Sequence, residues 1–344
     1  MAGIRGDQIA LYVKDMYKAE REGYKEMETK YNLIFKVVNG VKGSGDKVTQ
    51  ILGAGSLTRH KQEGQDIVYK SPVQGWEFFV KYWTYSDGIA LSKEAVEDTV
   101  KLGNLLKDLS QTWGKQVRIT KETHAARVFN FGGYLNGDWV FDGTCTGLTP
   151  PYAPLPYDNR PQFAIAGNNH ALRIVPVATT SGTGTLYNSI ASLPLSPANF
   201  ETVYNLHTAT NNRDERNLII QNPADTLLVQ PGQNRFLADR IMGTEKGLPG
   251  GQLNDINPYY KLCTVIDWDY LNDGSASTAA FYVGKRQSDD FQFHERQMSE
   301  IRFFRDETNL GYKTSINIRI GTLLKNFRTW SRGGGSSSSA AALT

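Results

Sequence analysis

The order of apolar and polar positions along the chain predicts a mixture of helices and strands. Residues 7–31 combine many charges with few apolar side chains, which is typical of a mostly polar helix or arm. The apolar run over 31–38 predicts a strand that ends at the turn-forming pair Asn39-Gly40. The aromatic and β-branched run over 76–85 predicts a further strand.

Between residues 92 and 131, apolar or small side chains recur every three or four positions, which indicates one long amphipathic helix. Ser92 is the expected N-cap, and Gly132 follows the last helical position. At about 1.5 Å per residue, such a helix is a spine roughly 60 Å long. Its core side is expected to carry Leu106, Leu109, Trp113 and Val117.

Residues 44–75 are rich in glycine and poor in apolar side chains, apart from a short alternating run over 67–70. This composition predicts a projecting β-hairpin that buries little of its own surface. Because an isolated two-stranded ribbon is marginally stable in water, we expect this extended loop to contact another subunit. The residues expected to make these contacts are Leu57, Thr58, Arg59, His60, Lys61, Glu63, Tyr69 and Lys70.

The second half of the chain alternates loops with short elements. Ser196-Pro197 begins a predicted helix, since serine is a frequent N-cap and proline fits the first helical turn. A buried strand over 225–231 precedes a helix over 235–242. Further strands are predicted over 262–269, 279–285, 291–294, 299–305 and 312–330, and the low-complexity tail 333–344 is expected to be disordered.

Composition narrows the function classes. The 344 residues carry 38 basic and 35 acidic side chains, a balance unlike that of a dedicated nucleic-acid binder. Cys145 and Cys263 lie far apart, so they indicate neither a disulfide framework nor a metal site, and they fit a reducing compartment. No apolar run approaches the ~18 residues of a membrane span, so we expect no membrane association.

Motifs that could carry chemistry are incomplete. His294-Glu295 begins a pattern like that of zinc proteases, but Met298 stands where the second histidine is required. The acidic stretch 267–273 is similar to a calcium loop, yet Leu271 replaces an oxygen ligand. His124 is expected on the surface of the long helix. The sequence therefore indicates no catalytic, cofactor-binding or metal-binding residues.

Three segments, taken in order, resemble the major capsid protein of tailed bacteriophages, which has the Hong Kong 97-type fold. Residues 64–98 are similar to the extended loop of that family where it leads into the spine helix. Residues 222–231 resemble the family's segment in which a strand and a proline precede a helix. Residues 303–319 are like its closing strand–turn–strand.

The resemblance implies an α+β fold with a long spine helix, a projecting β-hairpin, and peripheral and axial domains. The domains it implies are an N-terminal arm and first strand (1–43), the extended loop (44–75), the peripheral domain with the spine helix (76–133), the axial domain (134–284), the closing strands of the peripheral domain (285–332) and a disordered tail (333–344).

The resemblance also implies a non-enzymatic subunit of an icosahedral virion shell, assembled in the bacterial cytoplasm around double-stranded DNA. Expected partners are further copies in hexamers and pentamers, a separate scaffolding protein, a portal and a decoration protein. We expect non-specific DNA contact by Lys and Arg of the arm and the spine helix, because residues 1–47 carry nine basic and seven acidic groups. No cofactor is expected.

Two other classes remain open at this stage. Encapsulin-type nanocompartment shells share the fold and enclose protein cargo, and the contents of purified particles distinguish them from a phage head. An enzyme with an unmarked active site is the other class, and turnover by a monomer would reveal it.

Overall fold

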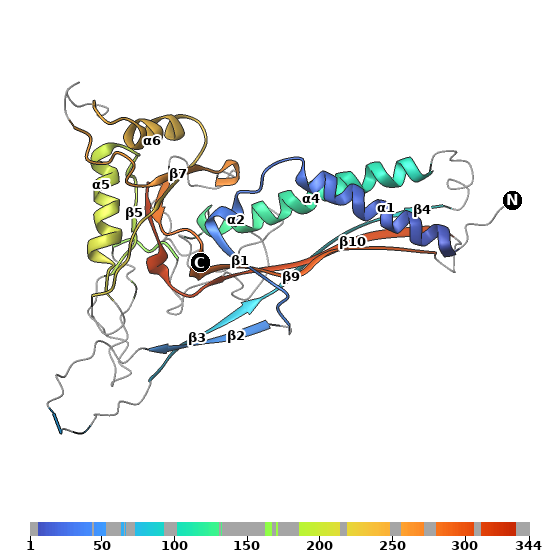
Figure 1. Cartoon of the computed structure of the whole chain (residues 1–344), viewed down its shortest axis with the longest axis horizontal. Coiled ribbons are helices and arrows are strands. Elements are labelled where there is room, and N and C mark those ends of the chain that lie inside the picture. Colours follow the sequence, from blue (N-terminus) through green and yellow to red (C-terminus); the bar gives the residue numbers. More distant parts are fainter. Residues whose placement is uncertain are drawn as a thin grey trace, which may run out of the picture.

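The computed structural model places two regions at an angle to one another, an elongated body and a more compact region at one end of it (Figure 1). The residues that the structure describes are 6–42, 45–52, 63–64, 66, 73–92, 102–130, 132, 162–166, 170, 186–213, 219–247, 256–271, 280–305 and 311–334.

The elongated body is built on a four-stranded sheet with the order β1-β9-β10-β4. Strand β9 (Ser288–Arg305) pairs in parallel with β1 (Phe35–Asn39) and antiparallel with β10 (Tyr312–Leu324). Strand β10 also pairs antiparallel with β4 (Trp83–Leu91). The sheet therefore joins segments from the beginning and the end of the chain.

Two helices cover one face of this sheet. Helix α4 (Leu102–Asn130) has 29 residues, or about 44 Å at ~1.5 Å per residue, and runs along the body. Helix α1 (Gly6–Lys25) lies beside α4, and the short helix α2 (Tyr31–Ile34) connects α1 to β1 (Figure 1). The described part confirms a long helix in the predicted segment, while its expected first turns, 93–101, lie outside the described residues.

The compact region contains a five-stranded sheet with the order β5-β11-β8-β6-β7. These strands are β5 (Ser189–Ile190), β11 (Trp330–Gly333), β8 (Phe281–Gly284), β6 (Thr226–Val229) and β7 (Thr264–Asp267). Helix α5 (Pro197–Asn205) continues into a π-helical turn (Leu206–Thr210), and helix α6 (Gln233–Gly243) follows β6. As predicted, Ser196 caps α5 by accepting a hydrogen bond from the Asn199 amide at 3.2 Å.

The remaining strands form a separate antiparallel ribbon, β2 (Gly45–Leu52) with β3 (Val73–Lys81). Figure 1 shows this ribbon beside the long sheet rather than within it. The end of the ribbon that leads into the body is packed. There Val80 and Tyr82 join a small buried cluster with Leu323 and Phe327.

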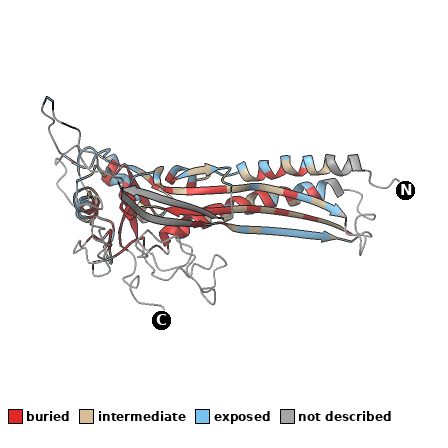
Figure 2. Ribbon diagram, turned by 90° about the horizontal axis from the view of Figure 1, so that it is seen from below, coloured by how far each residue is buried: buried red, intermediate tan, exposed pale blue. Residues whose placement is uncertain are grey.

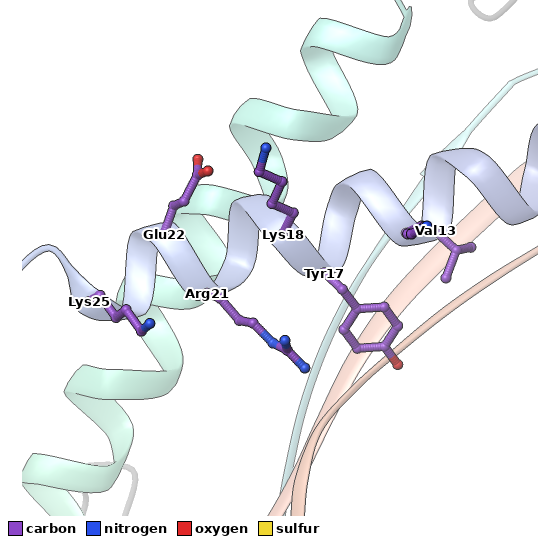
Figure 3. A pocket seen from close by; sticks show the side chains of 7 residues that line it. Val13, Tyr17, Lys18, Arg21, Glu22 and Lys25 are labelled. Atoms are coloured by element: carbon purple, nitrogen blue, oxygen red, sulfur yellow. The ribbon is translucent and has the colours of Figure 1, made fainter.

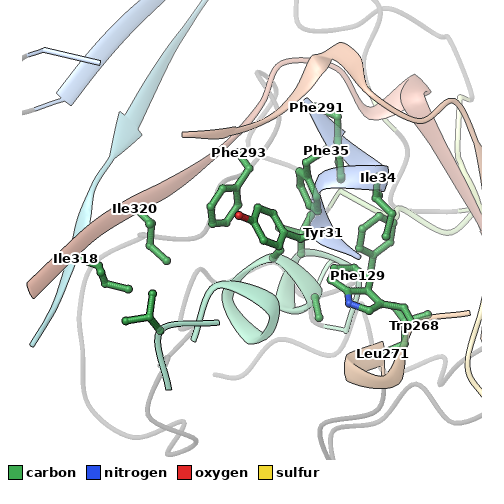
Figure 4. Close-up of a cluster of buried hydrophobic side chains, with 14 of the residues drawn as sticks. Tyr31, Ile34, Phe35, Phe129, Trp268, Leu271, Phe291, Phe293, Ile318 and Ile320 are labelled. Atoms are coloured by element: carbon green, nitrogen blue, oxygen red, sulfur yellow. The ribbon is translucent and has the colours of Figure 1, made fainter. Parts of the chain in front are cut away.

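The main core lies where the two regions meet. Helix α4 contributes Phe129, whose ring lies 5.0 Å from Tyr282, 5.4 Å from Trp330 and 5.9 Å from Trp268, measured between centroids. Figure 4 shows this cluster, in which Phe35 of β1 stacks on Phe291 of β9 at 4.5 Å. Burial is concentrated here, and it thins toward the far end of the sheet (Figure 2). This cluster therefore joins both regions, and a second cluster, which includes Phe200, Leu227 and Ile241, lies within the compact region.

Several predicted boundaries are wrong. The run 76–85 is divided between β3 and β4, so β3 crosses the expected boundary at residue 75. The predicted strands 291–294 and 299–305 are one strand, β9, because the polar residues between them are paired on the sheet. The first four residues of the predicted strand 31–38 form α2.

The end of the chain also differs from expectation. Strand β11 pairs with β8 and β5 in the compact region, rather than with the closing strands of the body. Gly333, assigned to the disordered tail, is a buried residue of β11. The added Cβ of an alanine at this position would lie 2.4 Å from the Phe281 ring, so only glycine fits there. The rest of the predicted tail, 335–344, lies outside the described residues.

Candidate interaction surfaces

The incomplete metal motifs have other roles in the structure. His294 and Glu295 are neighbours on strand β9, so their side chains point to opposite faces of the sheet. His294 Nδ1 lies 3.0 Å from the Tyr82 hydroxyl, while Glu295 faces α4. In the part of the chain that the structure describes, no group of three His, Cys, Asp or Glu side chains is placed to hold a metal ion.

The calcium-like stretch is held by a lysine. Lys30 Nζ lies 3.2 Å from Asp267 and 3.6 Å from Asp269, and it thereby links the end of the N-terminal segment to β7. Trp268 between them is buried against α4. The resulting arrangement is a structural contact between segments far apart in sequence.

A buried ionic cluster joins α4 to β9. Lys121 Nζ lies 3.0 Å from Glu295, and both side chains are less than a tenth exposed. The Tyr31 hydroxyl donates a hydrogen bond to Glu295 at 2.7 Å. Burial, followed by the charge of Glu295, raises the pKa of Tyr31, so this phenol remains a donor. Removing either charge would leave the other buried without its partner.

Glu122, one position along α4, serves a second junction. Its Oε1 accepts hydrogen bonds from the backbone amides of Lys30 at 2.6 Å and Tyr31 at 3.4 Å. Its Oε2 accepts one from Trp268 Nε1 at 2.7 Å. Burial raises the pKa of Glu122, and these donors oppose that shift. The carboxyl therefore ties two segments, at residues 30–31 and at Trp268, to the helix.

His124 was expected on the surface and is buried instead. It lies with 2% of its surface exposed, and its Nδ1 is 3.1 Å from the Tyr85 hydroxyl of β4. Burial, assisted by the charge of Arg127, lowers the pKa of His124 to about 3, so the imidazole is neutral. The prediction fails because the sheet and α2 together enclose the C-terminal third of α4, where polar residues are buried as well.

The expected core side of the spine helix faces the sheet. Leu106, Trp113 and Val117 are buried in the main cluster, and Leu109 is partly buried against it. Trp113 Nε1 also donates a hydrogen bond to Asp87 of β4 at 3.1 Å, which satisfies its only donor. The sequence pattern could not reveal this polar contact.

Helices α1 and α4 approach each other through two glycines that the sequence analysis did not assign to a contact. A Cβ at Gly23 would lie 2.1 Å from the carbonyl oxygen of Gln111, and one at Gly114 would lie 2.1 Å from that of Glu20. Real Cβ atoms do not approach so closely, so both positions need glycine. Tyr17 fixes α1 to the sheet, since its hydroxyl accepts from the Ile301 amide at 2.9 Å.

The outward side of α1 carries a row of cations. Lys14, Lys18, Arg21 and Lys25 are exposed and follow one another at spacings of four, three and four residues. Figure 3 labels Lys18, Arg21 and Lys25 beside a shallow hollow that Lys14, Val13 and Tyr17 also line. Glu22 is the acidic residue at its rim. We refer to these four residues as the α1 cation ridge.

The predicted contact residues of the extended loop cannot be compared with the structure. Leu57, Thr58, Arg59, His60, Lys61, Tyr69 and Lys70 lie outside the described residues. Glu63 is described and exposed. Of the predicted hairpin, the structure describes mainly the strand β2, which pairs with β3.

The sheet of the body offers a second exposed region. Residues 86–90 of β4 are all exposed, and β4 pairs with β10 on one side only among the described strands. The outer half of this strand is therefore open to solvent apart from the contact of Asp87 with Trp113 of α4. Among the described residues, no helix has the length and apolar character needed to cross a bilayer.

No protein-family model matches the chain, and neither does any curated protein. Several solved structures align over most of it. The capsid of the cyanophage P-SCSP1u is 10% identical and has a TM-score of 0.48, with 90% of this chain and 89% of that chain covered. The mature capsid of bacteriophage PhiM1 gives 7% identity, a TM-score of 0.49, and coverages of 89% and 87%.

A virus-like particle from Pyrococcus furiosus is also similar, at 9% identity and a TM-score of 0.44, with 93% of this chain and 98% of that chain covered. These neighbours are described as capsids or as a virus-like particle. With TM-scores below 0.5, the alignments by themselves assign neither a family nor a function.

Proposed function

We propose that this chain is the major capsid protein of a tailed bacteriophage. In this proposal, copies of the chain form the hexamers and pentamers of an icosahedral head that encloses double-stranded DNA. The role is structural and involves no catalysis. A separate scaffolding protein, a portal and a decoration protein are the further partners, and assembly takes place in the bacterial cytoplasm before the chain becomes part of the virion.

The observation that carries the proposal is the anchored ribbon. Strands β2 and β3 pair only with each other among the described strands, and they lie outside both sheets. The ribbon is packed at its root, where Val80 and Tyr82 are buried. Since a two-stranded ribbon gains little stability alone, a surface on another copy is the natural cover for it.

The shape of the body supports the same role. The helix-covered sheet is long and thin, and its far end is largely exposed (Figure 2). A shell needs subunits with large flanks, because stable interfaces bury about 800 Å² on each partner. The order of the elements also agrees with the resemblance of residues 64–98, 222–231 and 303–319 to the capsid family.

The test is to express the chain with the phage scaffolding protein and to image the product by electron microscopy. Closed shells of uniform size are expected. Particles filled with double-stranded DNA during infection support the phage head, whereas particles that contain a protein cargo and no genome support the encapsulin-type alternative. A monomer that does not assemble under any of these conditions contradicts the proposal.

A further inference from the structure

We propose that a crevice between helix α4 and the edge strand β4 binds a small organic cation, namely a primary amine carried on an apolar or aromatic body. We refer to it as the flank crevice. Its described walls come from β4, α4 and β10, and its volume is about 330 Å³. The inference goes beyond the proposed function, because it concerns a ligand that a single subunit can bind.

The floor of the flank crevice is apolar and belongs to the main core. Trp113 and Val117 of α4 meet Ile316 and Ile318 of β10 there, and all four side chains are buried. Since the packing of the helix on the sheet holds these residues, the floor exists before any ligand arrives. Small-molecule sites have volumes of about 300–1,000 Å³ and are lined mainly by apolar side chains, so the crevice has the size and the lining of a small one.

The mouth of the crevice carries one charge among its described residues, the carboxylate of Asp87. Asp87 is exposed on β4. The Trp113 indole donates a hydrogen bond to its Oδ2 at 3.1 Å, and the Gly88 amide donates one to its Oδ1 at 2.8 Å. A carboxylate can accept about four hydrogen bonds, so both oxygens can accept another. The two donors therefore fix the orientation of the carboxylate and leave it free to accept from a ligand.

The cations near the crevice are directed elsewhere. Lys115 of α4 pairs at 2.7 Å with Glu26, which directly follows α1. Arg319 follows Ile318 on β10, so its side chain points to the opposite face of the sheet. The α1 cation ridge lines a separate hollow. Within the described part of the chain, Asp87 forms no ion pair within 4 Å.

The crevice therefore combines a preformed apolar floor with a fixed negative charge at its mouth. Exposed carboxylates without an ion pair are common, and the position of Asp87 directly beside this floor is what indicates a ligand. A primary ammonium group can donate to Asp87 while its apolar body displaces water from the floor. An aromatic body is well suited, because it can pack against the Trp113 ring.

The walls also favour a free molecule over a basic side chain of a second copy. All the described residues that line the crevice belong to one chain, including the neutral side chains of Gln116 and Thr120 on α4. The site is thus complete without a neighbouring subunit.

The test titrates phenethylamine, and phenethyl alcohol as its neutral analogue, into the unassembled chain. The readout is the indole N–H resonance of Trp113 in NMR spectra, identified as the signal that is lost in Trp113→Phe. For an amine of this size we expect a dissociation constant of about 1 mM, and binding of the alcohol about fivefold weaker, since the pair with Asp87 is partly exposed to water. Asp87→Asn retains an acceptor for the indole. It is expected to weaken amine binding about fivefold and to leave alcohol binding unchanged.

Asp108→Asn is the matched control, because Asp108 is an exposed acid of α4 outside the crevice, and it is expected to retain the affinity of the parent chain for the amine. Gln116→Trp, at an exposed position of the mouth, is expected to block both ligands, and it provides the test if Asp87→Asn does not fold.

Equal affinities of the parent chain for amine and alcohol would overturn the inference, as would equal losses in Asp87→Asn and Asp108→Asn. It is also wrong if the amine does not bind while Asp87→Asn impairs the association of copies, because the occupant is then a basic side chain of a second copy. The titration uses the unassembled chain, so a failure to form shells contradicts only the proposed function.

Discussion

At the scale of residues, the side chains of Phe129 and Glu122 contact segments of the chain that lie far apart in the sequence. The Phe129 ring packs near aromatic rings from β1, β8, β9 and β11, so one cluster includes strands of both regions. The Glu122 carboxylate accepts hydrogen bonds from the backbone amides of Lys30 and Tyr31 and from the Trp268 indole. Single side chains of α4 therefore determine how the body and the compact region are joined.

Trp113→Ala is expected to destabilise the folded chain by about 3–5 kcal/mol, because a large buried side chain leaves a cavity. Trp113 is 1% exposed, and its indole hydrogen bond to Asp87 is lost as well. Thermal unfolding followed by circular dichroism measures the effect. Ile119→Ala on the same helix is the control, since Ile119 is 43% exposed and is expected to change stability little. An unchanged melting temperature in Trp113→Ala would refute the packing of α4 on the sheet.

Glu20 is expected to make stability depend on pH. Burial raises the pKa of Glu20, although a hydrogen bond from Ser299 and the charges of Lys121 and Arg21 oppose the shift. Its stabilising contribution is thus complete below the ordinary value of 4.5 and is lost as the pH rises through the folded-state pKa.

Glu20→Gln, which stays neutral, is therefore expected to gain stability relative to the parent chain at pH 7, and the difference shrinks toward pH 4.5. Urea unfolding at both pH values measures it. Glu28→Gln, at an exposed position, provides the comparison and is expected to show no such trend. A difference that grows on acidification would contradict the assignment.

At the scale of elements, the close crossing of α1 and α4 depends on glycine. Gly114→Ala is expected to destabilise the chain by about 1–3 kcal/mol, because the new methyl group overlaps the Glu20 carbonyl. This happens even though alanine is the better helix former by ~1 kcal/mol. Gly243→Ala in α6 is the control, since open space surrounds that position and the variant is expected to be as stable as the parent or more so. Chemical denaturation of both variants decides the matter.

The pattern of apolar positions predicts the helices and strands better than it predicts which of them pack together. The spacing of Leu106, Trp113 and Val117 indicates the long helix because one side of it is apolar and the other polar. The pattern fails for His124 and Glu295, which are polar and buried, because their burial depends on Tyr85 and Lys121 in other elements. Of the candidate contact residues in the extended loop, only Glu63 lies within the described residues.

At the scale of the whole molecule, the ribbon β2-β3 is paired with neither of the two larger sheets among the described strands. Deleting residues 56–66 is expected to leave a folded subunit, since the described cores are built from other segments of the chain. Closed shells are expected to be lost, because a contact between copies is removed. Circular dichroism measures the first outcome, and electron microscopy with the scaffolding protein measures the second. Normal shells from the shortened chain would refute a role of the loop between subunits.

The parallel pairing of β1 with β9 has a consequence for synthesis. Lys36 lies opposite Gln292, so the body cannot close until about 250 further residues have left the ribosome. At roughly 5–20 residues per second, that delay lasts about 10–50 seconds, during which the N-terminal half waits for its sheet partners. The sheet of the elongated body is therefore incomplete while the chain is being synthesised. A subunit can assemble with other copies only after the chain has been released from the ribosome.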